Sequence, residues 1–324
     1  MPALVKKVAR FTGRVFQDFK DTSQFSVAYA SYRMCRTLCS RIGLHTLATW
    51  AENKKAKWID NYLSECLQPV WDRFLSDQEF GEFQDNAPIW VCWWTGEDTA
   101  PSLVQRCIRS IRENAGPHPV HFITAENYST YLEIPDFLLK KLSDNQIGPA
   151  HFADYIRVKL LAEHGGLWLD ATIFCSAQVP ELCFAHPFFT CKSPKTHCPY
   201  LSEMRWTTFC LGGWKGNVFY RFLTAAFETY WQKAPCAIDY LFFDHIINLA
   251  IQNIPSAAQL LDAVPENNLH RDDLQAAMNA SLPASVFNTI LQTDTTLYKL
   301  SWRENYASQN EAGEPTVYAY FLSC

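Results

Sequence analysis

The sequence predicts an α/β protein with a mainly parallel sheet, preceded by a helical region. Segments typical of strands alternate with segments typical of helices over residues 88–174, which is the order expected of a parallel sheet covered by helices. Residues 1–80 instead carry few strand signals and much helical spacing. We therefore divide the chain into a basic helical N-terminal region, residues 1–85, and an α/β domain, residues 86–324.

The elements expected in the domain follow from apolar periodicity, glycine and proline breaks and helix caps. In the first half they are a strand at 88–96, a helix at 100–114, a strand at 118–124, a helix at 149–164 that closes on Gly165, and a buried strand at 165–174. In the second half they are a strand at 206–213, helices at 217–232 and 238–251, and a strand or turn at 295–303.

The composition is that of a protein with a large core. The 324 residues are 48% hydrophobic, which is enough to bury a substantial interior. The 12 cysteines are scattered rather than arranged as a disulfide framework, so we expect reduced thiols and a cytoplasmic location. No apolar run approaches the ~18–20 residues that cross a bilayer, so we expect a soluble protein or a peripheral one on the inner face of the cell membrane.

The charge is unevenly distributed. Residues 1–58 hold 11 basic and three acidic side chains, a balance of 11 − 3 = +8, whereas the whole chain is −5 and the remainder therefore −13. A basic, amphipathic N-terminus indicates contact with an anionic membrane surface. An ordinary surface helix packed on the body explains the same pattern equally well. We do not expect a nucleic-acid partner, because no binding motif accompanies the charge.

The helix expected at 149–164 places two opposite charges side by side. At about 100° per residue, Asp154 and Arg157 share one face and are three positions apart, so they can touch. Lys159 and Glu163 lie on the other face with His151, which we take as the solvent side. Two explanations stay open for Asp154 and Arg157: a structural ion pair, or a site for phosphate and sugar oxygens.

The strand after this helix favours a binding site. The glycines Gly165 and Gly166 let the helix end tightly and the backbone approach closely, and an apolar run then leads to Asp170. Ligands bind at the carboxyl ends of strands in α/β sheets. We therefore expect Asp154, Arg157 and Asp170 to converge at one cleft.

The block AHFADYIRVKLLAEHGGLWLDATIF resembles the core of the bacterial capsular-polysaccharide-synthesis glycosyltransferases, relatives of glycosyltransferase family 32. The likeness extends from IWVCWWTGEDTAP through WKGNVFYRF and AIDYLFFDHII to LYKLSW, roughly residues 86–303, and leaves the N-terminal 80 residues outside. It implies a GT-A-type, Rossmann-like domain that binds a nucleotide sugar. The implied reaction is sugar transfer, with retention of the anomeric configuration, to a glycan or a polyprenyl-diphosphate-linked acceptor in capsule, exopolysaccharide or lipopolysaccharide synthesis.

The resemblance also implies a divalent metal ion. Such enzymes usually carry Asp-x-Asp at the strand end, whereas this chain has Asp170-Ala171-Thr172. Asp170 matches the first acid and Thr172 replaces the second. We expect Asp170 and Thr172, together with diphosphate oxygens, to hold Mn²⁺ or Mg²⁺ loosely, because these ions keep waters and take substrate phosphates as ligands.

Matching blocks assign further residues to the nucleotide sugar. The aromatic pair Trp93 and Trp94, followed by Thr95 and Gly96, falls where the first strand meets the base. Because neighbouring strand residues point to opposite faces, at most one indole stacks on the base, and the other belongs to the core. Gly166 is assigned to the same site through its close backbone approach.

The late basic residue Lys299 falls where the leaving diphosphate is neutralised in relatives, with Trp302 nearby; a surface lysine is the equal alternative. Asp154, Asp170, Asp239 and Asp244 are the candidate catalytic acids. A helix cap explains Asp239 almost as well.

Two other functions stay open. A phosphatase of the haloacid-dehalogenase type also places an Asp at a strand end, but it needs a second Asp where this chain has Thr172. A non-catalytic assembly protein would keep nucleotide-sugar binding and lose transfer together with the second acid.

Overall fold

The computed structural model describes residues 2–195, 201–281 and 284–323. A five-stranded sheet with the order β2-β1-β3-β6-β5 forms its centre, and a two-stranded sheet pairs β4 with β7. The strands are β1 (Ile89–Cys92), β2 (Val120–Ile123), β3 (Gly166–Leu169), β4 (Ile173–Cys175), β5 (Phe188–Thr190), β6 (Cys210–Gly213) and β7 (Leu297–Lys299).

The central sheet is mainly parallel, as predicted. Strand β1 pairs in parallel with both β2 and β3, whereas β6 is antiparallel to β3 and to β5. Strand β5 therefore points the same way as β3, and only β6 runs against the other strands of this sheet. The carboxyl ends of β1 and β3 consequently lie at one edge.

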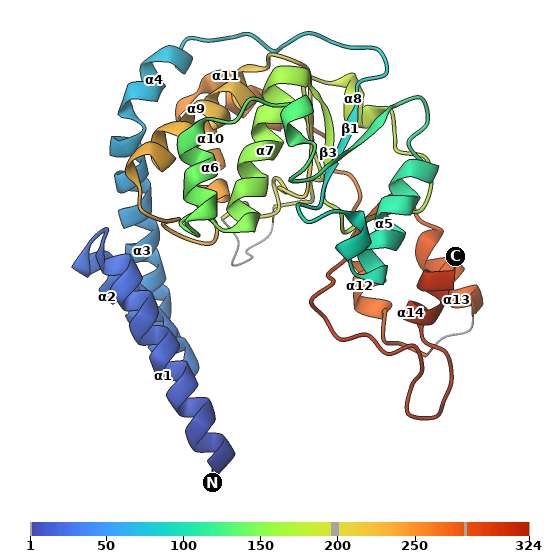
Figure 1. Ribbon diagram of the computed structural model, residues 1–324, viewed down its shortest axis with the longest axis horizontal. Helices are drawn as coiled ribbons and strands as arrows, with labels where there is room; N and C mark the ends of the chain where they lie inside the picture. The colour runs from blue at the N-terminus through green and yellow to red at the C-terminus, as the bar shows by residue number, and fades with distance from the viewer. Residues whose placement is uncertain (1, 196–200, 282–283, 324) are drawn as a thin grey trace.

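Helices surround the sheet and form a separate group at the N-terminus (Figure 1). The α-helices are α1 (Pro2–Ser23), α2 (Val27–Arg41), α3 (His45–Cys66), α4 (Gln68–Phe74), α5 (Ser102–Glu113), α6 (Asp136–Ser143), α7 (Pro149–His164), α8 (Leu182–Ala185), α9 (Val218–Lys233), α10 (Phe242–Asn253), α11 (Pro255–Asp262), α12 (Asp273–Ala277), α13 (Ala284–Leu291) and α14 (Val317–Ser323). Two short 3₁₀ helices, Glu97–Thr99 and Tyr128–Thr130, follow β1 and β2.

The core has two parts, one on each face of the sheet. Because side chains alternate along a strand, Trp168 of β3 joins the cluster formed with α7, α9 and α10, whereas Leu167 and Leu169 join the cluster on the opposite face, which includes side chains of α5. The first cluster also takes in Tyr29, Ile59 and other buried residues of α2–α4. The division at residues 85/86 stays a prediction, and one apolar cluster spans it.

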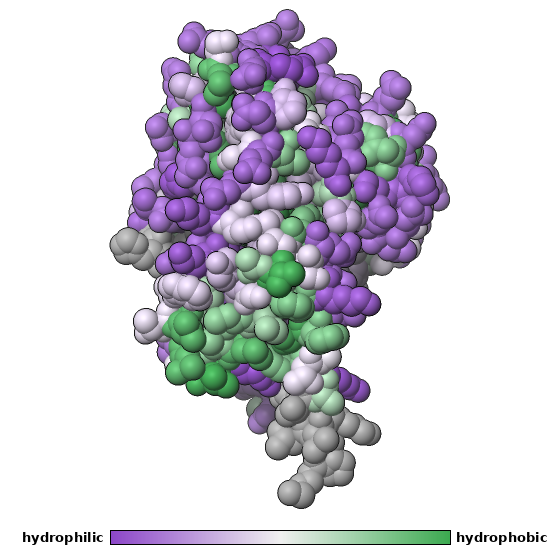
Figure 2. Space-filling view, turned by 90° about the vertical axis from the view of Figure 1, so that its left-hand side faces the viewer, coloured by the Kyte–Doolittle hydropathy of each residue, from purple (hydrophilic) through white to green (hydrophobic). Residues whose placement is uncertain are grey.

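The helical N-terminus is confirmed, and α1–α3 project from the body at the left of Figure 1. Figure 2 looks onto that side of the molecule and shows apolar side chains gathered on its lower part, whereas the upper part is mainly polar. In the part of the chain that the structure describes, no helix is both long and apolar enough to cross a membrane.

Four elements differ from the sequence predictions, one of them the strand expected at 206–213, which begins only at Cys210. The segment expected as one strand at 165–174 is two strands, β3 and β4, separated by a turn at residues 170–172 in which the Ile173 N–H donates to the Asp170 carbonyl. The strand expected at 88–96 ends at Cys92, and the helix expected at 238–251 begins only at Phe242. In each case the regular element is shorter than the apolar pattern suggested.

Candidate active site

A cavity of about 500 Å³ opens where β1 and β3 end. Residues of the turns after these strands, of helices α7 and α10, and of the segment 299–303 line it. Its walls include eight residues singled out in the sequence: Trp93, Asp154, Arg157, Asp170, Thr172, Asp244, Lys299 and Trp302. Segments far apart in the chain thus meet at one edge of the sheet.

Arg157 is the central charged residue of the cavity. Its Nη2 donates to Asp170 Oδ1 at 3.0 Å, and its Nη1 lies 3.0 Å from Asp154 Oδ1. The guanidinium also lies over the ring of Trp168, 4.8 Å from its centroid. The helix and the strand end that flank the double glycine therefore bring Asp154, Arg157 and Asp170 together, as expected.

The guanidinium of Arg157 is not fully used by these contacts. The residue is only 5% exposed, yet within the described chain its Nε and Nη1 have no hydrogen-bond acceptor of suitable geometry. A buried donor without an acceptor is costly, and such groups in native structures point to a ligand or an ordered water. The Nε2 atom of His151, which also lines the cavity, is likewise buried without a hydrogen-bond partner in the described chain.

A second cation, Lys299, lies on the other side of Asp170. Its Nζ is 3.3 Å from Asp170 Oδ2 and donates to the hydroxyl of Thr172. The antiparallel pairing of β7 with β4, which sets Lys299 opposite Ile173, brings this ammonium to the turn after β3. Asp170 Oδ1 accepts a further hydrogen bond from the Trp168 indole at 3.0 Å.

The surroundings shift the pKa values of the carboxyl groups in the cavity in different directions. Burial raises the pKa of Asp154 to about 7, although the charge of Arg157 acts against this. Burial would also raise the pKa of Asp170, but the charges of Lys299 and Arg157 outweigh it and hold this pKa below its ordinary value. Burial raises the pKa of Asp244, whose Oδ1 accepts from the Trp206 indole at 2.9 Å.

The donor set does not fit a divalent metal held by the protein. Asp170 Oδ1 already accepts hydrogen bonds from Arg157 and the Trp168 indole, and Asp170 Oδ2 is paired with Lys299. Thr172 Oγ1 also accepts a hydrogen bond from Lys299. No group of three or more His, Cys, Asp or Glu suited to a metal is found in the part of the chain that is described. The ammonium of Lys299 lies between the two residues to which we assigned the metal, and two cations there would repel each other.

The two neighbouring tryptophans have different surroundings. Trp93 reaches the cavity and packs edge-on against Trp302, with ring centroids 5.8 Å apart. Trp94 does not line the cavity and instead packs against Tyr128 and Phe152. Both follow β1 rather than lie on it, and Trp93 is the indole placed to contact a ligand.

Four more predicted residues do not line the cavity, and we no longer assign them to it. Thr95 is exposed and shares a hydrogen bond with Thr99, which also donates to the Gly96 carbonyl. Gly166 lies at the start of β3, at the end opposite the cavity, where it packs against the Pro88 carbonyl. The fourth, Asp239, holds the N-terminal helices.

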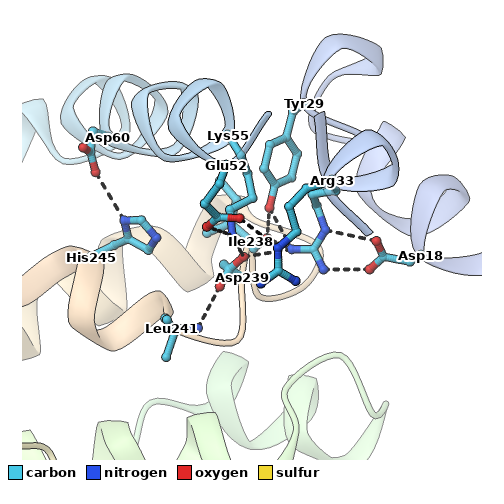
Figure 3. A network of polar contacts seen from close by, with 11 residues as sticks. Asp18, Tyr29, Arg33, Glu52, Lys55, Asp60, Ile238, Asp239, Leu241 and His245 are labelled. Carbon is cyan, nitrogen blue, oxygen red and sulfur yellow. Dashed lines mark hydrogen bonds and ion pairs between the residues drawn. The ribbon is translucent and has the colours of Figure 1, made fainter. Parts of the chain in front are cut away.

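Asp239 is the centre of a polar network between the body and α1–α3 (Figure 3). Its Oδ2 lies 3.0 Å from Arg33 Nη1 and 3.2 Å from Lys55 Nζ, and its Oδ1 accepts from the Leu241 N–H. Lys55 and Arg33 outweigh the effect of burial and lower the pKa of Asp239. The capping alternative is thus close to what the structure shows, because the carboxylate orders the turn that leads into α10.

We expect Asp239→Asn to lower the free energy of unfolding by about 2 kcal/mol, because Arg33 and Lys55 lose a buried counter-charge, while kcat stays within about twofold of wild type. The matched variant is Asp244→Asn, because Asp244 lies five residues after Asp239 and its carboxylate lines the cavity. This variant should lower kcat and have a smaller effect on the free energy of unfolding. Urea unfolding and initial rates measure both. A large loss of kcat in a stable Asp239→Asn protein would instead show that Asp239 takes part in catalysis.

Sequence reasoning missed several cavity residues: His151, Tyr240, Asp272, Gln275 and Arg303. His151 was assigned to the solvent side, which is wrong, because the first turn of α7 faces the cavity. The exposed Tyr240 sits one position after Asp239 in a turn that was expected to be helix. Nothing in the local pattern distinguishes Asp272, Gln275 or Arg303 from surface residues.

Fold and cavity together define an α/β protein with a cavity lined by charged residues of both signs at the carboxyl edge of its sheet. A family model described as capsular polysaccharide synthesis protein matches residues 42–321, so the chain belongs to this family. The match reaches well into the N-terminal helices, beyond the boundary of the resemblance at residue 86.

Two individual proteins are also similar. An O-glycosyltransferase, braB of Annulohypoxylon truncatum, is 28% identical over 160 residues, which are 45% of this chain and only 38% of that protein. The chain therefore matches less than half of the length of this curated relative. The solved structure of PaToxG glycosyltransferase aligns over 65% of this chain and 87% of its own with 12% identity and a TM-score of 0.30, too low to support an argument.

Proposed function

We propose that this protein is a glycosyltransferase that moves a sugar from a nucleotide sugar, UDP-linked by family likeness, to an acceptor hydroxyl in polysaccharide assembly. The observation that carries the proposal is the buried guanidinium of Arg157, whose Nε and Nη1 have no hydrogen-bond acceptor in the described chain, beside Lys299 in an open cavity. Two cations at one end of a cavity suit the diphosphate of such a donor. Membership of the capsular polysaccharide synthesis family supports the same activity.

In this proposal Arg157 and Lys299 bind the diphosphate, and Trp93 offers an aromatic surface to the base. When the bond between the anomeric carbon and the diphosphate oxygen breaks, its electron pair leaves with the diphosphate, and the two cations stabilise the growing negative charge. The acceptor oxygen bonds to the anomeric carbon, and its proton passes to the leaving phosphate. Ionised Asp154 stabilises the positive charge that develops on the sugar. We propose retention of configuration on family likeness alone.

The acceptor is proposed to enter from the side of α10. Asp244 and the exposed ring of Tyr240 line this part of the cavity, and an aromatic face beside a carboxylate suits a sugar ring with free hydroxyls. A glycan linked to polyprenyl diphosphate at the cytoplasmic face of the membrane is the acceptor that agrees with the basic N-terminus.

We propose that Lys299 supplies the positive charge that a metal ion supplies in Asp-x-Asp enzymes. We expect EDTA to change the Kd of UDP by less than about twofold, and Lys299→Gln to weaken binding roughly 10- to 100-fold, the loss of one charge-assisted contact. Isothermal titration of UDP with EDTA or Mn²⁺ measures both. Lys159→Gln is the control, because Lys159 pairs with Glu163 and Glu228 outside the cavity.

Other results of these experiments would identify other functions. UDP binding that requires Mn²⁺ in the wild type would favour the metal predicted at Asp170 and Thr172. Binding of a panel of UDP-sugars without release of UDP in the presence of acceptor would indicate an assembly protein. Hydrolysis of simple phosphomonoesters without any nucleotide sugar would indicate a phosphatase. UDP release that requires both the donor and an acceptor supports the transferase.

A further inference from the structure

The N-terminal helices end in an apolar surface away from the body. We call it the apical patch and define it by four residues at the α2–α3 turn: Leu38, Ile42, Leu44 and Leu47. Ile42 is 69% exposed, Leu44 50% and Leu47 42%. Apolar side chains gather on the lower part of the face seen in Figure 2, where α1–α3 lie. Monomeric soluble proteins seldom expose contiguous apolar side chains of this kind.

The charges around the apical patch have one sign. The guanidinium of Arg41 lies over the ring of Phe11, 4.1 Å from its centroid, so the end of α2 is level with this part of α1. Residues 2–17 and 34–51, which meet here, contain six Lys and Arg and no Asp or Glu. The six are Lys6, Lys7, Arg10, Arg14, Arg36 and Arg41, of which the side chains of Lys6 and Lys7 lie outside the described part.

Two of the three acids of the first 58 residues, Asp18 and Asp21, lie in the last turns of α1, and Asp18 pairs there with Arg33 near the body. The third, Glu52, pairs with Lys55 and with Arg36, so it neutralises one of the six cations. In contrast, the described salt bridges include none to Arg10, Arg14 or Arg41. The helical group is therefore polarised: neutralised where it meets the body, and cationic around its apolar end.

The helices that carry this patch are fixed to the acceptor side of the cavity. Arg33 and Lys55 bind Asp239, the Tyr29 hydroxyl donates to the Ile238 carbonyl, and His245 lies 3.2 Å from Asp60 (Figure 3). A second hollow, bounded by α1 and α2, shares His151 and Tyr240 with the cavity. A surface bound by the apical patch is thus held at a set position relative to the cavity mouth.

From this arrangement we infer that the apical patch inserts into the headgroup region of an anionic lipid bilayer. The apical patch matches the surface of such a bilayer in two ways. Its apolar side chains can insert at the boundary of the acyl chains, and the cations around it can pair with anionic headgroups. A protein partner of ordinary mixed charge would not require the absence of acids. The inference deepens the proposed function and rests on it in one respect: the bilayer would present the lipid-linked acceptor to the Tyr240 side of the cavity.

Vesicle co-sedimentation of the full chain tests the inference, with phosphatidylcholine vesicles that contain or lack phosphatidylglycerol. We expect binding to the anionic vesicles only, weakened tenfold or more in Ile42→Ser/Leu44→Ser/Leu47→Ser. Arg10→Gln/Arg14→Gln should weaken it by about 25-fold, since each of the two cations near the surface is worth roughly a factor of five. The control is Leu75→Ser/Leu182→Ser/Leu269→Ser, three exposed leucines elsewhere, which should bind like wild type.

Other outcomes would overturn the inference. Equal vesicle binding by the wild type and the apical variant would do so. So would wild-type protein that binds no vesicles and forms a dimer in solution that the apical substitutions dissociate, because the patch would then join two copies. The assay contains no donor or acceptor, so it stands or falls independently of the transferase reaction. If the apical variant loses turnover on a lipid-linked acceptor but keeps it on a soluble acceptor, membrane binding by the patch contributes to the transferase reaction.

Discussion

Arg157→Lys is expected to lower kcat/KM by about 100- to 1,000-fold. Lysine keeps the positive charge that Asp154 and Asp170 need but has one ammonium in place of the planar fork, so it cannot bind both of them and diphosphate oxygens at once. The magnitude is that of removing one preorganised stabiliser of charge in the transition state. Initial rates of UDP release with donor and acceptor, over a range of donor concentrations, measure it.

A matched substitution separates this effect from a general loss of arginine. Arg112 makes a bidentate pair with Glu97 on the surface, with both distances 2.7 Å, and Arg112→Lys should leave kcat/KM nearly unchanged. The thermal unfolding midpoint of each variant shows whether the fold is intact. Near-normal turnover by folded Arg157→Lys would mean that the guanidinium is a structural clamp, the alternative that the helix by itself left open.

Gly166→Ala is expected to lower the free energy of unfolding by more than about 3 kcal/mol. Gly166 has a φ of 98°, a region that residues with a side chain rarely adopt, and a Cβ would lie 2.2 Å from the backbone oxygen of Pro88. That same oxygen accepts from the Leu167 N–H, so the clash would disturb the entry of β3 beside β1. Urea unfolding followed by circular dichroism measures the change.

Gly13→Ala is the control for this variant. Gly13 lies within α1, where a Cβ added to it would meet nothing within 4 Å, and alanine should stabilise the helix there by roughly 0.5–1 kcal/mol. If Gly166→Ala were as stable as Gly13→Ala, the close approach of β3 to β1 could not be a constraint on the sequence.

The helix–glycine–strand unit was predictable because its signals are local. Pro149 in the first turn and the break at Gly165 set the bounds of α7, which agree with the prediction at both ends. The mainly parallel sheet followed from the order of strands and helices. The sequence placed Asp170 at the carboxyl end of a strand, but it did not show that Ile173–Cys175 form a separate strand, because that strand is defined by its pairing with β7 far along the chain.

The convergence of residues at the cavity was predictable where one helix–strand unit carries them, and was not predictable where distant segments of the chain decide it. Asp154, Arg157 and Asp170 come from consecutive elements, so helix periodicity and strand direction were enough to bring them together. Asp239 has the same residue type and lies near Asp244, yet Arg33 and Lys55, some 200 residues earlier, bind it outside the cavity. The metal prediction depended on Thr172, whose hydroxyl is bound by Lys299 from a strand 127 residues later.

By itself the sequence determined the α/β class, the cationic N-terminal helices and the delivery of three charged groups to one sheet edge. Each of these depends on interactions between residues close in the chain, and periodicity records such interactions. Only the tertiary structure decided which acids face the cavity, that an ammonium lies beside Asp170, and that apolar residues of the α2–α3 turn remain uncovered. Those features arise when segments far apart in the chain pack together. The residues next to a side chain in the sequence do not show which distant residue it will pack against.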